Sequence, residues 1–352
     1  MSGSTVELTG DQGPGAESRS VLVDRPGSHR IIRQALPEPA AGEVRLRVAA
    51  AGICMSDREL YDGRRAPGYV RYPVVPGHEW SGTVDAVGTG VDAALAGRKA
   101  VAEGFRACGT CARCRHGDTS LCTGGYAETG FTEPGAFADH LVVPARLLHL
   151  LDDGADLRAA ALLEPAAVVA GAVRAGAPVP GERIAVVGAG TLGLLAVQLL
   201  RAGSPGELTV IDPRTTRTEQ AVDLGATDGC SPAETTARQG EFDLVVETAG
   251  AADTAHDACL LARRGGRVVL TGMFSEGAKG IDPVHLSVSQ LTVRSVFGAA
   301  SSAWADAVHA FNLGLLAPAG LITHEFPLED YGAAVALVGS GDPAVGKVLL
   351  RP

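Results

Sequence analysis

Aromatic side chains and positive charge are both scarce in this chain of 352 residues. Phe, Tyr and Trp make up 4% of it, a bias of composition that excludes no function. The formal net charge is -10. This charge would repel the phosphates of a nucleic acid, so we expect no nucleic-acid partner.

Targeting and membrane-spanning segments are also missing from the sequence. The first 17 residues have neither the basic region nor the apolar run of a signal peptide. Residues 184–200 carry no charge, but the segment is short for a bilayer and three glycines interrupt it. The pattern is better explained by a buried strand, a glycine turn and a buried helix, and we expect no membrane partner.

Cysteine is present in an odd number, seven. An odd count that includes a metal-type cluster fits a reducing cytoplasm better than secretion, so we expect a cytoplasmic protein. Cys54, Cys230 and Cys259 lie outside the cluster, and the last two are interpreted as small core residues.

The cluster has the spacing C-x2-C-x2-C-x7-C, formed by Cys108, Cys111, Cys114 and Cys122. Four thiolates this close can converge on one tetrahedral zinc ion, and such a closed site supports structure rather than chemistry. Two disulfides, four free thiols or an iron centre are the alternatives that the ligand types leave open. His116 lies within the cluster and is interpreted as a surface residue.

The chain then divides into two patterns. Residues 1–18 are rich in Gly, Ser and acidic residues, which predicts a disordered tail. Residues 20–150 consist mainly of strand-like runs, and over residues 44–48 apolar side chains alternate with Arg45 and Arg47, as in a half-buried strand. This part is predicted to be mainly β, with the cysteine cluster inserted.

After about residue 159 the pattern changes. Largely apolar strands alternate with helices up to about residue 300, which is typical of a parallel, doubly wound sheet. The remaining residues return to mixed α and β and end in a strand-like run. The sequence therefore predicts an α/β protein with two domains.

A glycine-rich turn follows one of these apolar strands and opens a helix. It reads G-x-G-x-x-G and consists of Gly188, Ala189, Gly190, Thr191, Leu192 and Gly193. Its glycines allow a tight turn, the approach of a pyrophosphate and close helix packing, while the helix N-terminus attracts phosphate. The motif alone is weak and is also found in purely structural turns.

Asp212 strengthens the dinucleotide interpretation. It ends the next strand, where a carboxylate can accept hydrogen bonds from the adenosine ribose and repel a 2′-phosphate, so NAD is favoured over NADP. Arg214 and Arg217 follow closely. They could cover the adenine face or, less readily, admit a phosphate.

A second constellation suggests a reactive metal site. Cys54 and His78 lie on glycine-flanked turns after strands, and Glu164 is a charge in an otherwise apolar stretch. A cysteine, a histidine and a carboxylate can hold zinc and leave a fourth position open. Separately, each has an ordinary explanation: a core cysteine, a hydrogen-bonded histidine and a glutamate stabilised at a helix N-terminus.

With both sites in place, the chain resembles the zinc-dependent medium-chain alcohol dehydrogenase family, in the sorbitol, threonine and cyclitol dehydrogenase branch. The similar segments are GICMSD, YPVVPGHEWSGTV, the cysteine cluster, VVGAGTLGLL with VID, and THEFPLED. The resemblance implies a GroES-like catalytic domain (residues 19–163 and 300–352, zinc lobe 104–125). A Rossmann dinucleotide-binding domain would span residues 164–299.

The resemblance also implies roles for single residues. Cys54, His78 and Glu164 would bind catalytic zinc, and Glu79 would exchange onto the metal. Asp57 would orient His78, and Ser56 would accept the substrate proton. Arg217 would belong to the NAD site. Each chain would then hold two zinc ions, one catalytic and one structural, together with NAD.

Two positions depart from the family pattern. Met55 replaces a glycine, which could alter the turn or narrow the pocket. Glu59 stands three residues after Ser56, where many members carry a relay histidine. Glu59 either takes over as the terminal base, or is an exposed charge while the proton leaves through the cofactor ribose.

The resemblance implies reversible oxidation of a secondary alcohol in a polyol, cyclitol or aminocyclitol to a ketone. Threonine or another amino alcohol is the alternative substrate. A zinc-independent reductase and a non-catalytic relative are disfavoured, because neither the metal ligands nor the glycine turn is eroded. Homodimers or homotetramers are implied.

Overall fold

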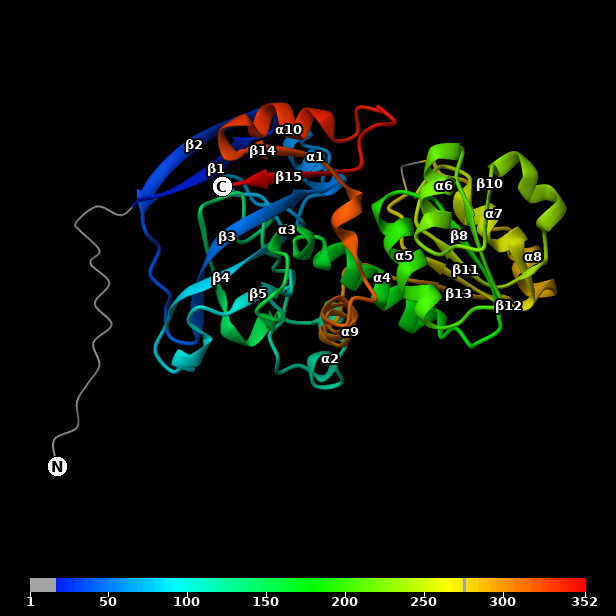
Figure 1. The fold of residues 1–352 in the computed structure, drawn as a ribbon, viewed down its shortest axis with the longest axis horizontal. Helices are drawn as coiled ribbons and strands as arrows, with labels where there is room; N and C mark the ends of the chain where they lie inside the picture. Colours follow the sequence, from blue (N-terminus) through cyan, green and yellow to red (C-terminus); the bar gives the residue numbers. More distant parts are fainter. Residues whose placement is uncertain (1–16, 275–276) are drawn as a thin grey trace.

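The computed structural model describes residues 17–274 and 277–352, which form two lobes (Figure 1). Residues 1–16, most of the predicted tail, lie outside the described residues. The first strand begins at Glu17, because it pairs with the second strand from there onward, so the strand starts before the predicted end of the tail.

The first lobe is built on a seven-stranded sheet. Its order is β14-β15-β3-β4-β5-β7, with β6 paired to β3, and β1 and β2 form a separate two-stranded sheet. The strands are β1 (Glu17–Arg25), β2 (Ser28–Ala35), β3 (Glu43–Ile53), β4 (Glu79–Val87), β5 (Lys99–Ala102), β6 (His140–Pro144), β7 (Leu148–Leu150), β14 (Ile322–Pro327) and β15 (Lys347–Arg351).

Strand β3 shows why this sheet is more buried than its sequence pattern indicates. Val44 and Leu46 lie in the core, as predicted, and Arg47 is exposed. Arg45 was predicted to face solvent, but it is only 3% exposed. Its Nε donates to Asp85 Oδ1 at 2.9 Å, so the buried charge is paired.

The second lobe is a six-stranded parallel sheet in the order β10-β9-β8-β11-β12-β13. In chain order this is 3-2-1-4-5-6, the Rossmann arrangement, which confirms the predicted doubly wound sheet. The strands are β8 (Arg183–Val187), β9 (Glu207–Ile211), β10 (Asp228–Cys230), β11 (Phe242–Glu247), β12 (Ala262–Leu270) and β13 (Thr292–Ser295). Its helices are α5 (Thr191–Ala202), α6 (Thr215–Asp223), α7 (Thr254–Leu261) and α8 (Pro283–Val288).

The apolar segment 184–200 forms parts of β8 and α5 and the turn between them, as predicted. None of the helices in the described residues is both long and apolar enough to span a bilayer.

Helices α4 and α9 lie between the two lobes (Figure 1) and pack together in one hydrophobic core with the inner helices of the second lobe. The chain then returns to the first lobe, where β15 pairs with β3. The remaining helices are α1 (Met55–Asp62), α2 (Ala112–Arg115), α3 (Leu157–Ala160), α4 (Leu163–Gly176), α9 (Ser301–Asn312) and α10 (Tyr331–Leu337). The short 3-10 helices are η1 (Ala93–Leu95), η2 (Thr119–Leu121), η3 (Ala145–Leu147), η4 (Pro232–Arg238), η5 (Pro318–Leu321) and η6 (Leu328–Asp330).

Candidate active site

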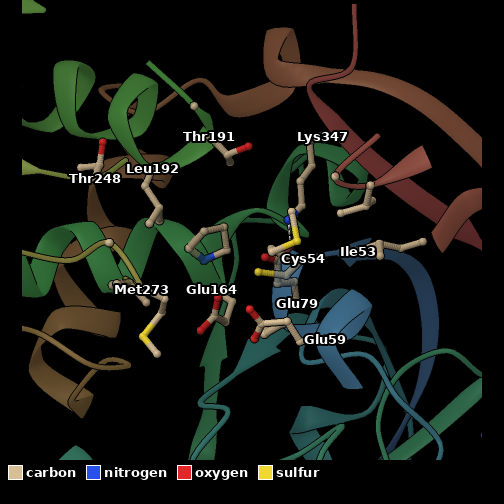
Figure 2. Close-up of a pocket in the computed structure, with 18 of the residues that line it drawn as sticks. Ile53, Cys54, Glu59, Glu79, Glu164, Thr191, Leu192, Thr248, Met273 and Lys347 are labelled. Atoms are coloured by element: carbon tan, nitrogen blue, oxygen red, sulfur yellow. Dashed lines mark ion pairs between the residues drawn. The ribbon is translucent and has the colours of Figure 1, made fainter. Parts of the chain in front are cut away.

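A cavity of about 580 Å³ lies between the two lobes and is lined by residues of both. It reaches from the predicted metal ligands to the glycine turn at the carboxyl end of β8. Strands β8 and β11 are the central neighbours where the order of the parallel sheet reverses, and ligands bind at such a point. Figure 2 shows side chains from several elements directed into this space.

Cys54, His78 and Glu79 come together at one end of the cavity. Cys54 is the N-cap of α1 directly after β3, and His78 directly precedes β4. Because β3 and β4 are antiparallel with Gly52 opposite Glu79, these two strand ends meet. One ligand atom from each of the three residues lies within 4.8 Å of the others.

Asp57 holds both the turn and the imidazole. Its Oδ2 accepts the backbone N–H of Cys54 at 2.9 Å, and its Oδ1 lies 3.4 Å from His78 Nδ1. The other ring nitrogen, Nε2, is 3.5 Å from Ser56 Oγ. Burial alone would lower the pKa of His78, but Asp57 and other negative groups nearby raise it well above its usual value. The site therefore favours a positive charge at the imidazole.

Glu164 lies in the first turn of α4 and lines the same cavity (Figure 2). Burial raises its pKa to about 7, opposed by His78 and reinforced by Glu79. It is not part of the group of three ligand atoms within 4.8 Å. The structure thus places Glu79 directly beside Cys54 and His78, and Glu164 close by.

Lys347 is a charged residue at this site that the motifs did not predict. It begins β15, is 4% exposed and forms an ion pair with Glu79 (Figure 2). A side chain at Gly52 would overlap both partners, so the glycine leaves room for the pair. The only signal in the sequence is one lysine ahead of the apolar run VLL.

The donor set fits a catalytic zinc site. A thiolate, an imidazole and a carboxylate are zinc ligands, and three of them leave a position open toward the cavity. Buried side-chain atoms without a hydrogen-bond partner concentrate here: among the described residues they include Asp57 Oδ1, His78 Nδ1 and Glu79 Oε2. Buried polar atoms are normally satisfied, so their presence at one place suggests that a bound ion completes the network.

The two positions that depart from the family pattern also line the cavity. Met55 is 46% exposed, and its side chain lies against Gly339, where a Cβ would be 2.7 Å from Met55 Cε. Met55 therefore narrows this side of the cavity. Glu59 is half-buried and directed into the cavity (Figure 2), so it is more than an exposed charge.

The glycine turn has the geometry that the motif predicts. Gly188 has φ +99°, and a Cβ there would lie 2.9 Å from the backbone nitrogen of Ala249. At Gly193 a Cβ would overlap the Gly188 carbonyl, whereas Gly190 faces open space. Gly190, Thr191 and Leu192 line the cavity, and α5 presents its N-terminus there, where a phosphate binds well.

The three residues predicted around the adenosine differ in position. Asp212 ends at β9, is 4% exposed and accepts from Ala189 N and Arg214. Despite burial, these hydrogen bonds lower the pKa of Asp212. Arg214 lines the cavity, whereas Arg217 is buried and its Nη2 donates to the Val345 carbonyl at 2.8 Å. Arg217 therefore supports the loop beside the cavity rather than its wall.

The cysteine cluster forms a separate lobe of the first domain. The four sulfur atoms lie within 4.8 Å of one another, and Cys108 Sγ is 3.9 Å from Cys114 Sγ. A disulfide needs about 2.05 Å, whereas sulfurs bound to one tetrahedral zinc at about 2.3 Å lie about 3.8 Å apart. All cysteines are free, and His116 is exposed and outside this group.

Backbone amides support the sulfurs as anions. The N–H of Cys114 donates to Cys111 Sγ at 3.5 Å, and this and further hydrogen bonds lower the pKa of Cys111 to about 5. Burial raises the pKa of Cys114 to about 12. Thr119 of the lobe accepts the N–H of Ser301 at the start of α9, which ties the lobe to the rest of the protein. The group fits a structural zinc ion.

Comparisons with known proteins agree with this architecture. Residues 40–153 match the model of the alcohol dehydrogenase GroES-like domain, and residues 191–312 match that of the zinc-binding dehydrogenases. The 2-dehydro-3-deoxy-L-galactonate 5-dehydrogenase of Pseudoalteromonas atlantica is 33% identical, covering 92% of this chain and 96% of that protein. The starvation-sensing protein RspB of Escherichia coli is 30% identical, covering 94% and 98%.

A solved structure shows the same fold over nearly the whole chain. It is an alcohol dehydrogenase (rspB) of Escherichia coli in complex with the cofactor NADH. The TM-score is 0.89 at 30% identity, and the match covers 96% of this chain and 100% of that one. The predicted combination of a GroES-like and a Rossmann part is confirmed.

Proposed function

Since this chain belongs to the zinc-dependent medium-chain alcohol dehydrogenase family, we propose that it oxidises a secondary alcohol of a polyol, cyclitol or aminocyclitol with NAD. The alcohol carbon gives its hydride to the nicotinamide, the hydroxyl gives its proton to the protein, and a ketone results. The reaction is reversible. One observation carries the proposal: a single cavity joins the Cys54–His78–Glu79 group to the glycine turn of the Rossmann sheet.

Cys54 and His78 would hold the catalytic zinc together with a carboxylate. The family resemblance implies Glu164 for that ligand, with Glu79 as an exchange partner, whereas the observed proximity favours Glu79. Zinc bound there would supply Lewis acidity, which lowers the pKa of an alcohol oxygen and polarises a carbonyl. Asp57 keeps the imidazole oriented through Nδ1, so that Nε2 faces the cavity.

Ser56 and Glu59 would carry the proton away. They are three residues apart on α1 and thus on the same face of the helix, and both line the cavity. Ser56 accepts the hydroxyl proton of the substrate. Glu59 is placed to take the proton onward, in the position where many relatives have a histidine.

NAD rather than NADP is the proposed cofactor. The carboxylate of Asp212 at the end of β9 would repel a 2′-phosphate. Arg214 does not reverse this preference, because its guanidinium forms an ion pair with Asp212 at 2.8 Å. The cytoplasmic location and the homodimer or homotetramer stay predictions from the sequence.

The test is initial-rate formation of NADH, with NAD and NADP run side by side. The substrate panel holds aminocyclitols, inositols, sugar alcohols, threonine and simple secondary alcohols. We expect turnover of the polyol or cyclitol class with NAD. Turnover of threonine alone would overturn the substrate class. Silence across the panel in protein that holds two zinc ions would point to a substrate outside these classes.

A further inference from the structure

A buried carboxylate that the proposed mechanism does not use also lines the cavity. Glu128 is 7% exposed, and its Oε2 accepts from Tyr126 Oη and from Arg65 Nη2, the latter at 3.2 Å. Its second oxygen, Oε1, has no hydrogen-bond partner among the described residues, and it is not one of the fully buried unsatisfied atoms. The wall beside it is open, since even a Cβ at Gly104 would be 3.7 Å away.

Arg65 fixes this carboxylate and is itself fully engaged. Its Nε donates to the Tyr69 carbonyl at 2.8 Å, and its Nη2 donates to Tyr126 Oη at 2.8 Å. Its guanidinium lies over the ring of Phe131, 3.5 Å from the centroid. Phe131 in turn contacts His78, with 4.7 Å between ring centroids. The Arg65–Glu128 pair is therefore a rigid unit next to the predicted metal site.

Aromatic residues gather around this pair although the chain has few of them. Phe105 and Phe297 line the cavity, and their centroids are 6.0 Å apart. Tyr126 contacts Phe105, and Tyr69 contacts both Tyr126 and Phe297. A wall of this kind offers apolar faces for the C–H surface of a ring or carbon chain, while Glu128 offers an acceptor for its polar groups.

The charges of the cavity disfavour acidic substrates. Three cations line it, and each is neutralised by a carboxylate: Arg65 by Glu128, Lys347 by Glu79 and Arg214 by Asp212. Glu59 and Glu164 line it too, and neither has an ion-pair partner in the described part of the chain. A substrate carboxylate or phosphate would thus meet paired cations and further negative charge.

We propose that Glu128 is a specificity-determining residue, which accepts hydrogen bonds from hydroxyl or ammonium groups of the substrate and excludes acidic and phosphorylated polyols. The inference rests on the proposed function and narrows it to uncharged and amino-bearing substrates. Arg65 is the positioning residue that keeps the Oε1 atom of Glu128 turned to the cavity.

The experiment compares substrates that differ in charge alone. One series is sorbitol, 2-amino-2-deoxysorbitol, gluconate and sorbitol 6-phosphate, and the other is myo-inositol, an aminodeoxyinositol and myo-inositol 1-phosphate. Burial raises the pKa of Glu128 to about 7, so rates with NAD are measured at pH 9, where the carboxyl is ionised. Binding of the same compounds to the NADH-loaded protein is measured by calorimetry.

The variant is Glu128→Gln, and the matched control is Glu133→Gln, a glutamate of the same loop that does not line the cavity. In the wild type we expect the neutral or amino member of a series to exceed its acidic member by at least about tenfold in kcat/KM. In Glu128→Gln we expect kcat/KM for the favoured member to fall about ten- to hundredfold through KM, as for the loss of a hydrogen bond to a charged group. Glu133→Gln should match the wild type.

Three results would overturn the inference: a wild-type preference for the acidic member, an unchanged charge preference in Glu128→Gln, or an equal effect of Glu133→Gln. If Glu128→Gln is unstable, Glu128→Asp decides, because it keeps the charge but withdraws the acceptor and should also raise KM. Turnover of acidic members alone would refute the inference and leave the dehydrogenase assignment intact. No turnover and no binding in either series would refute the proposed substrate class as well.

Discussion

The two cysteine sites of this chain are built in opposite ways. The four-cysteine lobe is made within residues 108–122, near the surface, and its ligand set closes around one position. The site of Cys54 and His78 is buried and draws on two strands, two helices and the distant β15. The lobe can be predicted from spacing alone, whereas the second site depends on how separate segments meet.

The difference also separates structure from chemistry. Four sulfurs satisfy a tetrahedral ion and leave it no free position, so the lobe stabilises the fold. Three ligands beside a cavity of about 580 Å³ leave a position for a substrate. Variants in the two sites should therefore fail differently, and the following predictions begin with the largest effect.

Replacement of Cys54 or His78 by Ala should lower kcat by about a thousandfold or more, because the metal that polarises the substrate oxygen is lost. The folded protein should keep the structural zinc. Rates, circular dichroism and zinc content measured on the same preparation provide the check. Substantial activity in a variant that has lost this zinc would contradict the assignment.

Replacement of Cys111 by Ala should instead act on stability. Loss of a structural zinc opens the lobe and its contact with Ser301, and we expect the Tm to fall by roughly 5 °C or more. Thermal unfolding and limited proteolysis of the lobe measure this effect. Cys230→Ala, a half-buried cysteine outside both sites, is the control. A wild-type Tm with one zinc missing would show that the lobe does not need its metal.

The carboxylate ligand can be identified by a matched pair, Glu79→Gln and Glu164→Gln. Glu79 is beside Cys54 and His78, so its variant should lose more catalytic zinc and about ten- to hundredfold in kcat/KM. Zinc titration of both variants measures the difference. If Glu164→Gln loses the metal and Glu79→Gln keeps it, the ligand implied by the family resemblance is the right one.

The smallest effect is expected at Glu59. Glu59→Gln should lower kcat about tenfold with little change in KM, because Ser56 can still pass its proton to water by another route. Asp62→Asn, one turn away on α1 and paired with Arg58, is the control. Equal rates in both variants would leave Glu59 as a cavity charge with no part in proton transfer.

The sequence predicted those features that depend on local spacing. The cysteine cluster, the glycine turn after β8 and the change from a mainly β to a doubly wound pattern were all visible as motifs or periodicities. The turns that carry Cys54 and His78 were visible too, because they follow strands directly.

Features that depend on distant segments could not be predicted. Arg45 looks like a solvent-facing residue until Asp85 on the neighbouring strand provides its partner. Lys347 meets Glu79 only because β15 returns to pair with β3. Glu128 has no pattern around it in the sequence, and only the fold places it against Arg65 at the cavity.

The most direct test of the account is stepwise removal of zinc from the wild-type protein with a chelator. We predict two zinc ions per chain at the start. One should be removed together with all activity while the Tm changes little, and added zinc should restore the rate. Removal of the first zinc without loss of activity, or full activity in protein with a single zinc held by the four cysteines, would contradict the division into an open catalytic site and a closed structural one.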